Sequence, residues 1–462
     1  MLARSMTLCT LALAGTALAD PEQVSRWAEE GKVRAEAMRG LPFLQDVPVE
    51  FMTRSEIEDA ILDMVEEQMP PEWQLRVDRG YKAFGLVPMD SDVIGDMIRL
   101  VVSQAGGFYD PDAEHVILPD DLEEFMGQMA GEMAAQAPGF MEQLMRNILT
   151  HEFTHALQDQ HHDLNGMLDV TLDDDDVRMA ITALVEGDAT LIGTGAMMSP
   201  EGDLTGLLQQ DPAAMGAMMG AGGGMVGPEA AAMPQILKET LIFPYVHGYI
   251  LVTTMVRDGG FERVDAAFAD PPISTEQLLH IDKYLGTERD EPTAITLPDI
   301  DLEALGWEPV SENTLGEFQI RVLLGNSPDA IMAAEGWDGD RFRVWEQDDG
   351  RLGVAWISVW DSDADARQFA EECIYHEARR FEGDAARPTR TNADGRLEIA
   401  VGNPQDQSWV TVEGDTVVLT RGFPADTIGV IEDSMRRFSQ MSIKTWADIR
   451  ANAESQAEVS TP

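Results

Sequence analysis

Residues 151–155 read His151-Glu152-Phe153-Thr154-His155, and this HExxH pattern is the segment from which the fold and the chemistry can be argued. On an α-helix, side chains four residues apart lie on the same face, so one metal ion can contact both imidazoles. The glutamate beside the first histidine can accept a proton from a water molecule on that metal. The pattern therefore predicts a helix that presents most of a hydrolytic zinc site.

Apolar residues at helical spacing surround the motif. Continuing their stripe leads through His151, Glu152 and His155, so these polar side chains are expected on a buried face. Buried polar groups must be paired or bound to a metal, which favours the metal site. A motif with three fixed positions can also arise by chance, and a metal-free structural protein is therefore an alternative. The upstream apolar residues are Met141, Leu144, Met145, Ile148 and Leu149.

A zinc site of this type needs a third protein ligand and keeps one position for water. The histidine that follows HExxH in metzincins is absent here. Glu186 lies in a helix-like segment, residues 177–192, and a glutamate from a second helix could complete a His₂Glu site. His161 and His162 are the alternatives, although ordinary roles at a helix C-terminus suit them better.

Several segments resemble a known family. HExxH followed by Glu-Gly-x-Ala at 186–189 is similar to the pattern of gluzincin-type metallopeptidases. More specifically, the chain resembles a group of bacterial and archaeal neutral zinc metallopeptidase-like proteins. The matching stretches are 105–111, 151–161, 183–190, 243–245 with Gly248, 271–284 and 336–341. The resemblance implies that His151, His155 and Glu186 hold Zn²⁺ and that Glu152 is the general base.

Two further roles depend on this resemblance. Gluzincins commonly supply a His or Tyr that stabilises the oxyanion, and His280 is the first candidate because it lies in a matching segment, with His247 and Tyr245 as alternates. Many gluzincins also place an aspartate about one turn after the ligand glutamate, where it holds a zinc-bound histidine. Here that position is Thr190, and Asp188 lies only two residues on, so this partner is left open.

The composition limits the cellular setting and the partners. Residues 1–19 combine one positive charge, a short apolar run and an Ala-x-Ala end, which predicts a signal peptide and a secreted or periplasmic protein. No other stretch is apolar enough to predict a membrane span. The net charge of −51 disfavours nucleic acid by repulsion and suggests adaptation to salt. After signal removal Cys373 is the only cysteine, and we expect a buried thiol.

The acidic run Asp173-Asp174-Asp175-Asp176 has two interpretations. Four carboxylates could bind calcium. Carboxylates also favour the first turn of a helix, and a solvated acidic cluster that starts a helix is the preferred interpretation.

These patterns predict an α+β protein. A mainly helical zincin-like domain with a small edge sheet is expected over residues 20–300. In it, residues 108–118 are the candidate for the edge strand that binds an extended substrate, and a plain scaffold hairpin is the alternative. Residues 211–233, rich in Ala, Gly and Met, are expected to be a flexible insertion. A C-terminal α+β domain is expected over 301–450, followed by a flexible tail at 451–462.

The resulting hypothesis is a zinc metallopeptidase that hydrolyses peptide or protein substrates. The main alternative keeps the zinc but makes the chain a binding or assembly factor of the cell envelope with little proteolysis. Substrate sequence, endo- or exo-cleavage and oligomeric state stay open at this point.

Overall fold

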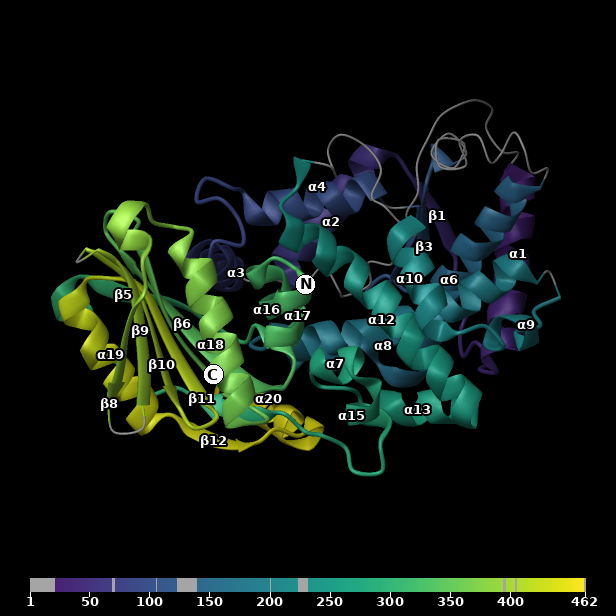
Figure 1. Ribbon diagram of the computed structural model, residues 1–462. Helices are drawn as coiled ribbons and strands as arrows, with labels where there is room; N and C mark the ends of the chain where they lie inside the picture. The colour runs from purple at the N-terminus through teal and green to yellow at the C-terminus, as the bar shows by residue number, and fades with distance from the viewer. Residues whose placement is uncertain are drawn as a thin grey trace. The chain divides into compact units, whose positions relative to one another are not determined.

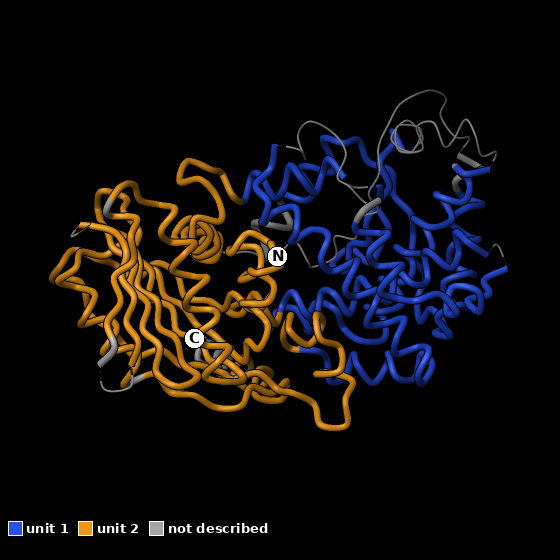
Figure 2. The backbone as a smooth tube through the Cα atoms, viewed as in Figure 1, with its two compact units in different colours: residues 1–70, 94–171, 178–272 blue, residues 71–93, 172–177, 273–462 orange. Residues whose placement is uncertain are grey.

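The computed structural model describes residues 21–68, 71–104, 106–122, 139–199, 201–222, 232–393, 396–403 and 405–460. The chain is an α+β protein, as predicted, and combines helices with three sheets (Figure 1). It divides into two compact units (Figure 2): residues 1–70, 94–171 and 178–272 form the first unit, and residues 71–93, 172–177 and 273–462 form the second unit. The predicted signal peptide, residues 1–19, lies outside the described residues.

The first unit is mainly helical. Its core includes Ala28 and Ala35 of α1 packed against Leu149 and Phe153 of α6, beneath a small sheet. Gly31 permits the close approach of the two helices, since a Cβ there would lie 3.1 Å from Leu149 Cβ. Its helices are α1 (Pro21–Arg39), α2 (Arg54–Gln68), α4 (Val93–Gln104), α6 (Phe140–His162), α7 (Leu164–Asp169), α8 (Asp175–Met198), α9 (Thr205–Leu208), α10 (Pro212–Gly222), α12 (Gln235–Gly259) and α13 (Phe261–Ala269).

The small sheet corrects one prediction. Residues 108–118 form a hairpin of β2 (Phe108–Asp110) and β3 (His115–Pro119), and β1 (Val49–Met52) pairs with β3 in parallel. The strand order is β1-β3-β2, so β3 is central and β1 and β2 are the two edge strands of this sheet. The β-branched pattern of Val116 and Ile117 could not distinguish a central strand from an edge strand, because that depends on a partner distant in sequence.

The second unit is built on a seven-stranded antiparallel sheet of order β5-β6-β7-β11-β10-β9-β8. A turn at Gly414-Asp415 joins β10 to β11. The strands of this unit are β4 (Thr293–Thr296), β5 (Trp307–Asn313), β6 (Trp337–Gln347), β7 (Leu352–Trp360), β8 (Thr389–Ala393), β9 (Arg396–Asn403), β10 (Asp406–Glu413), β11 (Thr416–Phe423) and β12 (Gln440–Ile443).

Helices cover both faces of the large sheet. Successive residues of β7 alternate between two cores: Trp356 packs with α16, α17 and α18, whereas Ile357 packs with α19. This alternation follows from the two-residue period of a strand. Cys373 of α18 is buried, as predicted. The helices of this unit are α3 (Pro71–Phe84), α14 (Glu276–Leu279), α15 (Ile281–Leu285), η1 (Glu303–Leu305), α16 (Gly316–Leu324), α17 (Pro328–Ala334), α18 (Asp363–Ala378), η2 (Gly383–Ala386), α19 (Ala425–Phe438) and α20 (Trp446–Ser460).

The observed division differs from the predicted boundary near residue 300. Helix α3 belongs to the second unit, where Phe84 joins the core beside Trp356 and accepts a hydrogen bond from Arg421 at its backbone oxygen. Residues 172–177 and the segment from 273 onward belong to the same unit. The sequence pattern marks α3 as an amphipathic helix, but it does not identify the sheet that the apolar face covers.

Two segments expected to be flexible are partly helical. Within 211–233, residues Pro212–Gly222 form α10, which packs on α12, while 223–231 lie outside the described residues. Of the expected tail at 451–462, residues 451–460 belong to α20, and 461–462 lie outside the described residues. Alanine and methionine favour helices, and this preference outweighs the glycines of α10. No helix of the described residues is long and apolar enough to cross a membrane.

Candidate metal centre

Helix α6 places the HExxH motif inside the first unit. The helix begins after Gly139, whose φ is 87°, and ends before Asp163, whose φ is 52°. Both residues lie in the left-handed region, which interrupts helical hydrogen bonding. His151 and His155 are each 2% exposed and Glu152 is 0% exposed. The prediction that the motif lies on the buried face is confirmed.

The structure brings Glu186 of α8 to the two histidines. The Nε2 atoms of His151 and His155 are 3.2 Å apart, and Glu186 Oε2 lies 3.5 Å and 3.6 Å from them. One ligand atom from each residue lies within 4.8 Å of the other two, and no other such group of His, Cys, Asp and Glu exists among the described residues. Gly193 permits the approach of α8, since a Cβ there would lie 3.0 Å from His151 Cβ.

These three side chains suit a divalent cation. Two imidazole nitrogens and a carboxylate oxygen converge in a buried place, and Glu186 Oε2 has no hydrogen-bond donor among the described residues. A buried polar atom without a partner costs free energy, and a cation at this point would satisfy it. Imidazole and carboxylate ligands in a set of three match a catalytic zinc site. The set itself does not distinguish zinc from other transition metals that bind imidazole.

The electrostatics of the two glutamates differ. Burial, and then the charge of Glu186, raise the pKa of Glu152 well above its usual range. Burial also opposes the ionisation of Glu186, but the nearby imidazoles of His151 and His155 outweigh it and lower its pKa. Glu186 is therefore the stable anion of the pair, and Glu152 is the group that readily holds a proton.

The three candidates for stabilising the oxyanion have different surroundings in the structure. The Tyr245 ring lies nearly parallel to the His151 imidazole, with 6.3 Å between ring centroids. His247, on the same helix, stacks on Phe243 with 4.5 Å between centroids. His280 belongs to the second unit, where its Nε2 lies 3.0 Å from Glu317 Oε1, and this contact raises its pKa. Of the three, Tyr245 has a contact to a predicted metal ligand.

The alternative third ligands have other partners. His161 Nε2 lies 2.8 Å from the backbone oxygen of Pro42. The His162 ring stacks on Phe268 with 4.3 Å between centroids. Neither histidine belongs to the group formed by His151, His155 and Glu186. Their place at the end of α6 is therefore structural, as the sequence favoured.

Behind the histidines, sequence reasoning left Asp188 open and missed Gln158 and Arg39. His155 Nδ1 lies 2.7 Å from Gln158 Oε1, and Gln158 Nε2 lies 3.1 Å from Asp188 Oδ2. Asp188 is bound by Arg39, whose Nε lies 2.8 Å from the same oxygen. The spacing of His155 and Gln158 on one helix face could have indicated the first contact. Arg39 comes from α1, and no local pattern connects it with residue 188.

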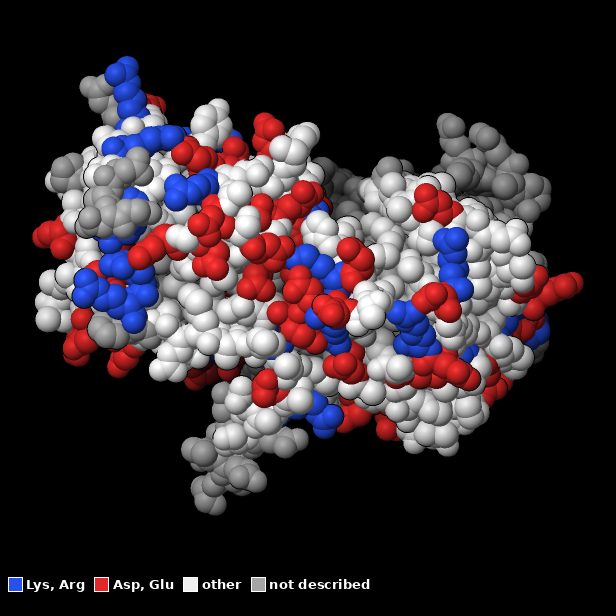
Figure 3. Space-filling model, turned by 60° about the horizontal axis from the view of Figure 1, so that its bottom comes forward, with Lys and Arg blue, Asp and Glu red and all other residues white. Residues whose placement is uncertain are grey.

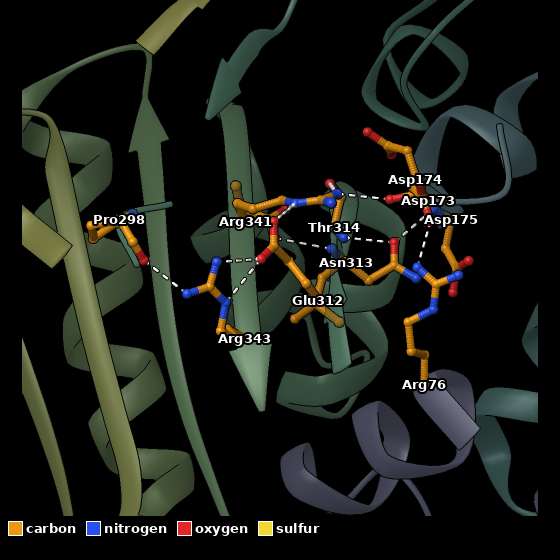
Figure 4. Close-up of polar contacts among 12 residues, drawn as sticks. Arg76, Asp173, Asp174, Asp175, Pro298, Glu312, Asn313, Thr314, Arg341 and Arg343 are labelled. Atoms are coloured by element: carbon orange, nitrogen blue, oxygen red, sulfur yellow. Dashed lines mark hydrogen bonds and ion pairs between the residues drawn. The ribbon is translucent and has the colours of Figure 1, made fainter. Parts of the chain in front are cut away.

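The acidic run at 173–176 is engaged by cations and backbone groups of the second unit. Arg76 and Arg341 approach Asp173, and the backbone N–H of Asp175 donates to Asn313 (Figure 4). Lys444 Nζ lies 2.7 Å from Asp174 Oδ2. Helix α8 begins at Asp175, so the helix-starting role is confirmed.

The expectation of a solvated cluster is wrong for one member of this run. Asp176 is 1% exposed and accepts hydrogen bonds from the backbone N–H and hydroxyl of Thr275. Burial raises its pKa to about 8. A carboxyl that favours its proton is a poor calcium ligand, and the run does not form a metal-ligand group among the described residues.

Comparison with known proteins covers only part of the chain. Residues 304–432 match the model of a family described as a domain of unknown function (DUF8575). This match lies within the second unit and the predicted C-terminal domain. No curated protein and no solved structure matches the chain.

Proposed function

We propose that this chain is a zinc-dependent peptidase of the gluzincin type that acts on peptide or protein substrates in a secreted or periplasmic setting. The observation that supports the proposal is the convergence of His151, His155 and Glu186 beside a buried Glu152. Such a group is costly to bury unless it binds a cation. In the HExxH motif, the glutamate is a proton acceptor next to the position of the cation.

In this proposal His151, His155 and Glu186 hold the zinc ion. A zinc ion in such a set polarises a water molecule and a carbonyl group. Glu152 takes a proton from the attacking water on one of its carboxylate oxygens and passes it to the departing amine. Its two carboxylate oxygens have no hydrogen-bond donors among the described residues, which suits a group that receives and releases a proton.

Two neighbouring groups suit substrate binding. Strand β2 packs against α6, the helix that carries Glu152. Its open edge could pair with an extended peptide, as in other strand-addition complexes. Tyr245, beside His151, is the preferred donor to the oxyanion that forms on the carbonyl.

Metal analysis combined with a peptide-cleavage screen tests the proposal. The purified chain should contain about one zinc per molecule, and cleavage of a peptide library should stop with a chelator and return with zinc. Glu186→Gln should lose both zinc and cleavage. Glu142→Gln is a matched control on α6, because Glu142 is more than half exposed and pairs with Arg146.

Two outcomes contradict the peptidase. Zinc retention without cleavage of any peptide would favour a binding or assembly factor of the envelope. A chain without zinc, and unaltered by Glu186→Gln, would be a structural protein in which the motif is coincidental.

A further inference from the structure

The hydrogen bonds behind the metal-ligand group extend through four side chains in the first unit. They run from His155 of α6 through Gln158 to Asp188 of α8 and Arg39 of α1. All four residues are between 0% and 3% exposed. Because water cannot reach these atoms, the protein alone decides which of them donate and which accept.

The orientation of the Gln158 amide follows from its neighbours. One end lies 2.9 Å from the backbone oxygen of Val185 and 3.1 Å from Asp188 Oδ2. A carbonyl oxygen only accepts hydrogen bonds, and Asp188 Oδ2 already accepts one from Arg39, so this end must be the NH₂ group. The reversed amide would place an oxygen against two acceptors in a buried site. The Gln158 oxygen therefore faces His155.

Arg39 holds the Asp188 side chain in place. The guanidinium donates from Nε to Asp188 Oδ2 and from a terminal nitrogen to Asp265 Oδ1 of α13, at 2.8 Å and 2.5 Å. The side chains of Arg39 and Asp188 are both 0% exposed. A guanidinium only donates hydrogen bonds, so the two aspartate oxygens that it contacts act as acceptors.

We infer that Gln158 is a positioning residue that fixes the tautomer of His155. Its oxygen, 2.7 Å from His155 Nδ1, can only accept, so Nδ1 carries the proton and Nε2 keeps a lone pair. That lone pair is the one directed at His151 and Glu186. A neutral amide, aligned by the Arg39–Asp188 pair, thus performs the orienting role that a carboxylate performs in many metal sites.

This inference rests on the proposed metal site but does not require peptide cleavage. Gln158→Met keeps the length and volume of the side chain and removes the acceptor. We expect zinc affinity, measured by competition with a chromogenic chelator, to fall roughly 10- to 100-fold. Gln160→Met is the matched control: Gln160, two residues later on α6, binds the backbone of Leu44 and Gln45, and its loss should leave zinc affinity within about threefold of the original protein.

A second measurement needs neither a variant of Gln158 nor a metal. Two-bond ¹H–¹⁵N spectra of the metal-free protein distinguish a histidine protonated at Nδ1 from one protonated at Nε2, and the signals are assigned with His155→Gln. The expected result is a proton on His155 Nδ1. A proton on Nε2, or a Gln158→Met variant with unchanged zinc affinity, would overturn the inference.

The two proposals fail in different ways. A wild-type chain that binds zinc and cleaves no peptide removes the peptidase and leaves the role of Gln158 intact if Gln158→Met still weakens zinc binding. A chain that cleaves peptides and binds zinc equally well with and without Gln158 keeps the peptidase and removes the positioning role.

Discussion

Gly187 and Gly248 meet backbone to backbone where α8 crosses α12. A Cβ on Gly187 would lie 2.2 Å from the backbone carbonyl of Gly248, and a Cβ on Gly248 would lie 1.9 Å from the backbone oxygen of Ala183. No side chain can be accommodated at these distances without moving a helix. Because Gly187 directly follows Glu186, this crossing sets the position of the third predicted metal ligand.

We predict that Gly248→Ala destabilises the protein and weakens zinc binding. Overpacking of this kind costs roughly 1–3 kcal/mol or more, and the displaced α8 would carry Glu186 away from the histidines. Thermal unfolding and chelator competition measure the two effects. Gly259→Ala on the same helix is the control, because its Cβ would meet only the Arg263 side chain at 3.5 Å. If the two variants had the same unfolding temperature and the same zinc affinity, the close approach of Gly187 and Gly248 would not be important for the site.

Glu152→Gln should keep zinc but lose most of the hydrolytic activity. The amide cannot accept a proton, and general-base catalysis contributes about 10²- to 10⁴-fold to such rates. The measurements are kcat on a cleaved peptide and the zinc content of the same preparation. Unaltered turnover in a variant free of wild-type protein would refute the assignment of Glu152 as the base.

Tyr245→Phe should lower kcat more than it changes KM. Loss of one oxyanion donor typically reduces kcat by about 10²- to 10³-fold, while ground-state binding is little affected. His280→Gln is the informative comparison, because His280 was the first candidate from the sequence and contacts Glu317 and Arg321 in the second unit. A large loss of kcat in His280→Gln with full activity in Tyr245→Phe would restore the original choice.

The buried Glu432 of α19 should make stability depend on pH. Burial raises its pKa from 4.5 to about 8, although Thr411 donates a hydrogen bond to Oε2. The folded protein therefore keeps a proton that the unfolded chain releases. Its stabilising contribution is complete below about pH 4.5 and is lost as the pH rises through about 8.

Glu432→Gln tests this dependence because the amide cannot ionise. The free energy of unfolding of the variant should improve relative to wild type as the pH rises from 5 towards 8, measured by urea denaturation. Glu308→Gln, at an exposed position of β5, is the control and should show a constant difference. The prediction would be contradicted if the free energy of unfolding of Glu432→Gln also differed from that of wild type by the same amount at every pH.

Added salt should raise the unfolding temperature. The chain has 83 acidic and 32 basic residues, and Asp and Glu side chains are spread over much of the face seen in Figure 3, with Lys and Arg in smaller groups beside them. Raising the ionic strength from about 0.01 M to 1 M shortens the screening length from about 30 Å to 3 Å and weakens the repulsion. Sucrose at equal osmolality controls for solvent effects. No gain with sodium chloride over sucrose would exclude salt adaptation.

The sequence by itself determined the features that depend on local periodicity. The helices that carry His151, His155 and Glu186 were predicted from apolar spacing, since a residue's face in a helix follows from its neighbours in the chain. The buried face of the HExxH motif followed from the same argument.

The tertiary structure decided the features that depend on residues distant in the chain. It placed β3 in the centre of its sheet, assigned α3 to the second unit, and brought Gln158, Asp188 and Arg39 together behind His155. It also gave His280 a partner in Glu317 and put Tyr245 beside His151. Contacts of this kind arise from the packing of whole helices and sheets, and no local pattern of residues specifies them.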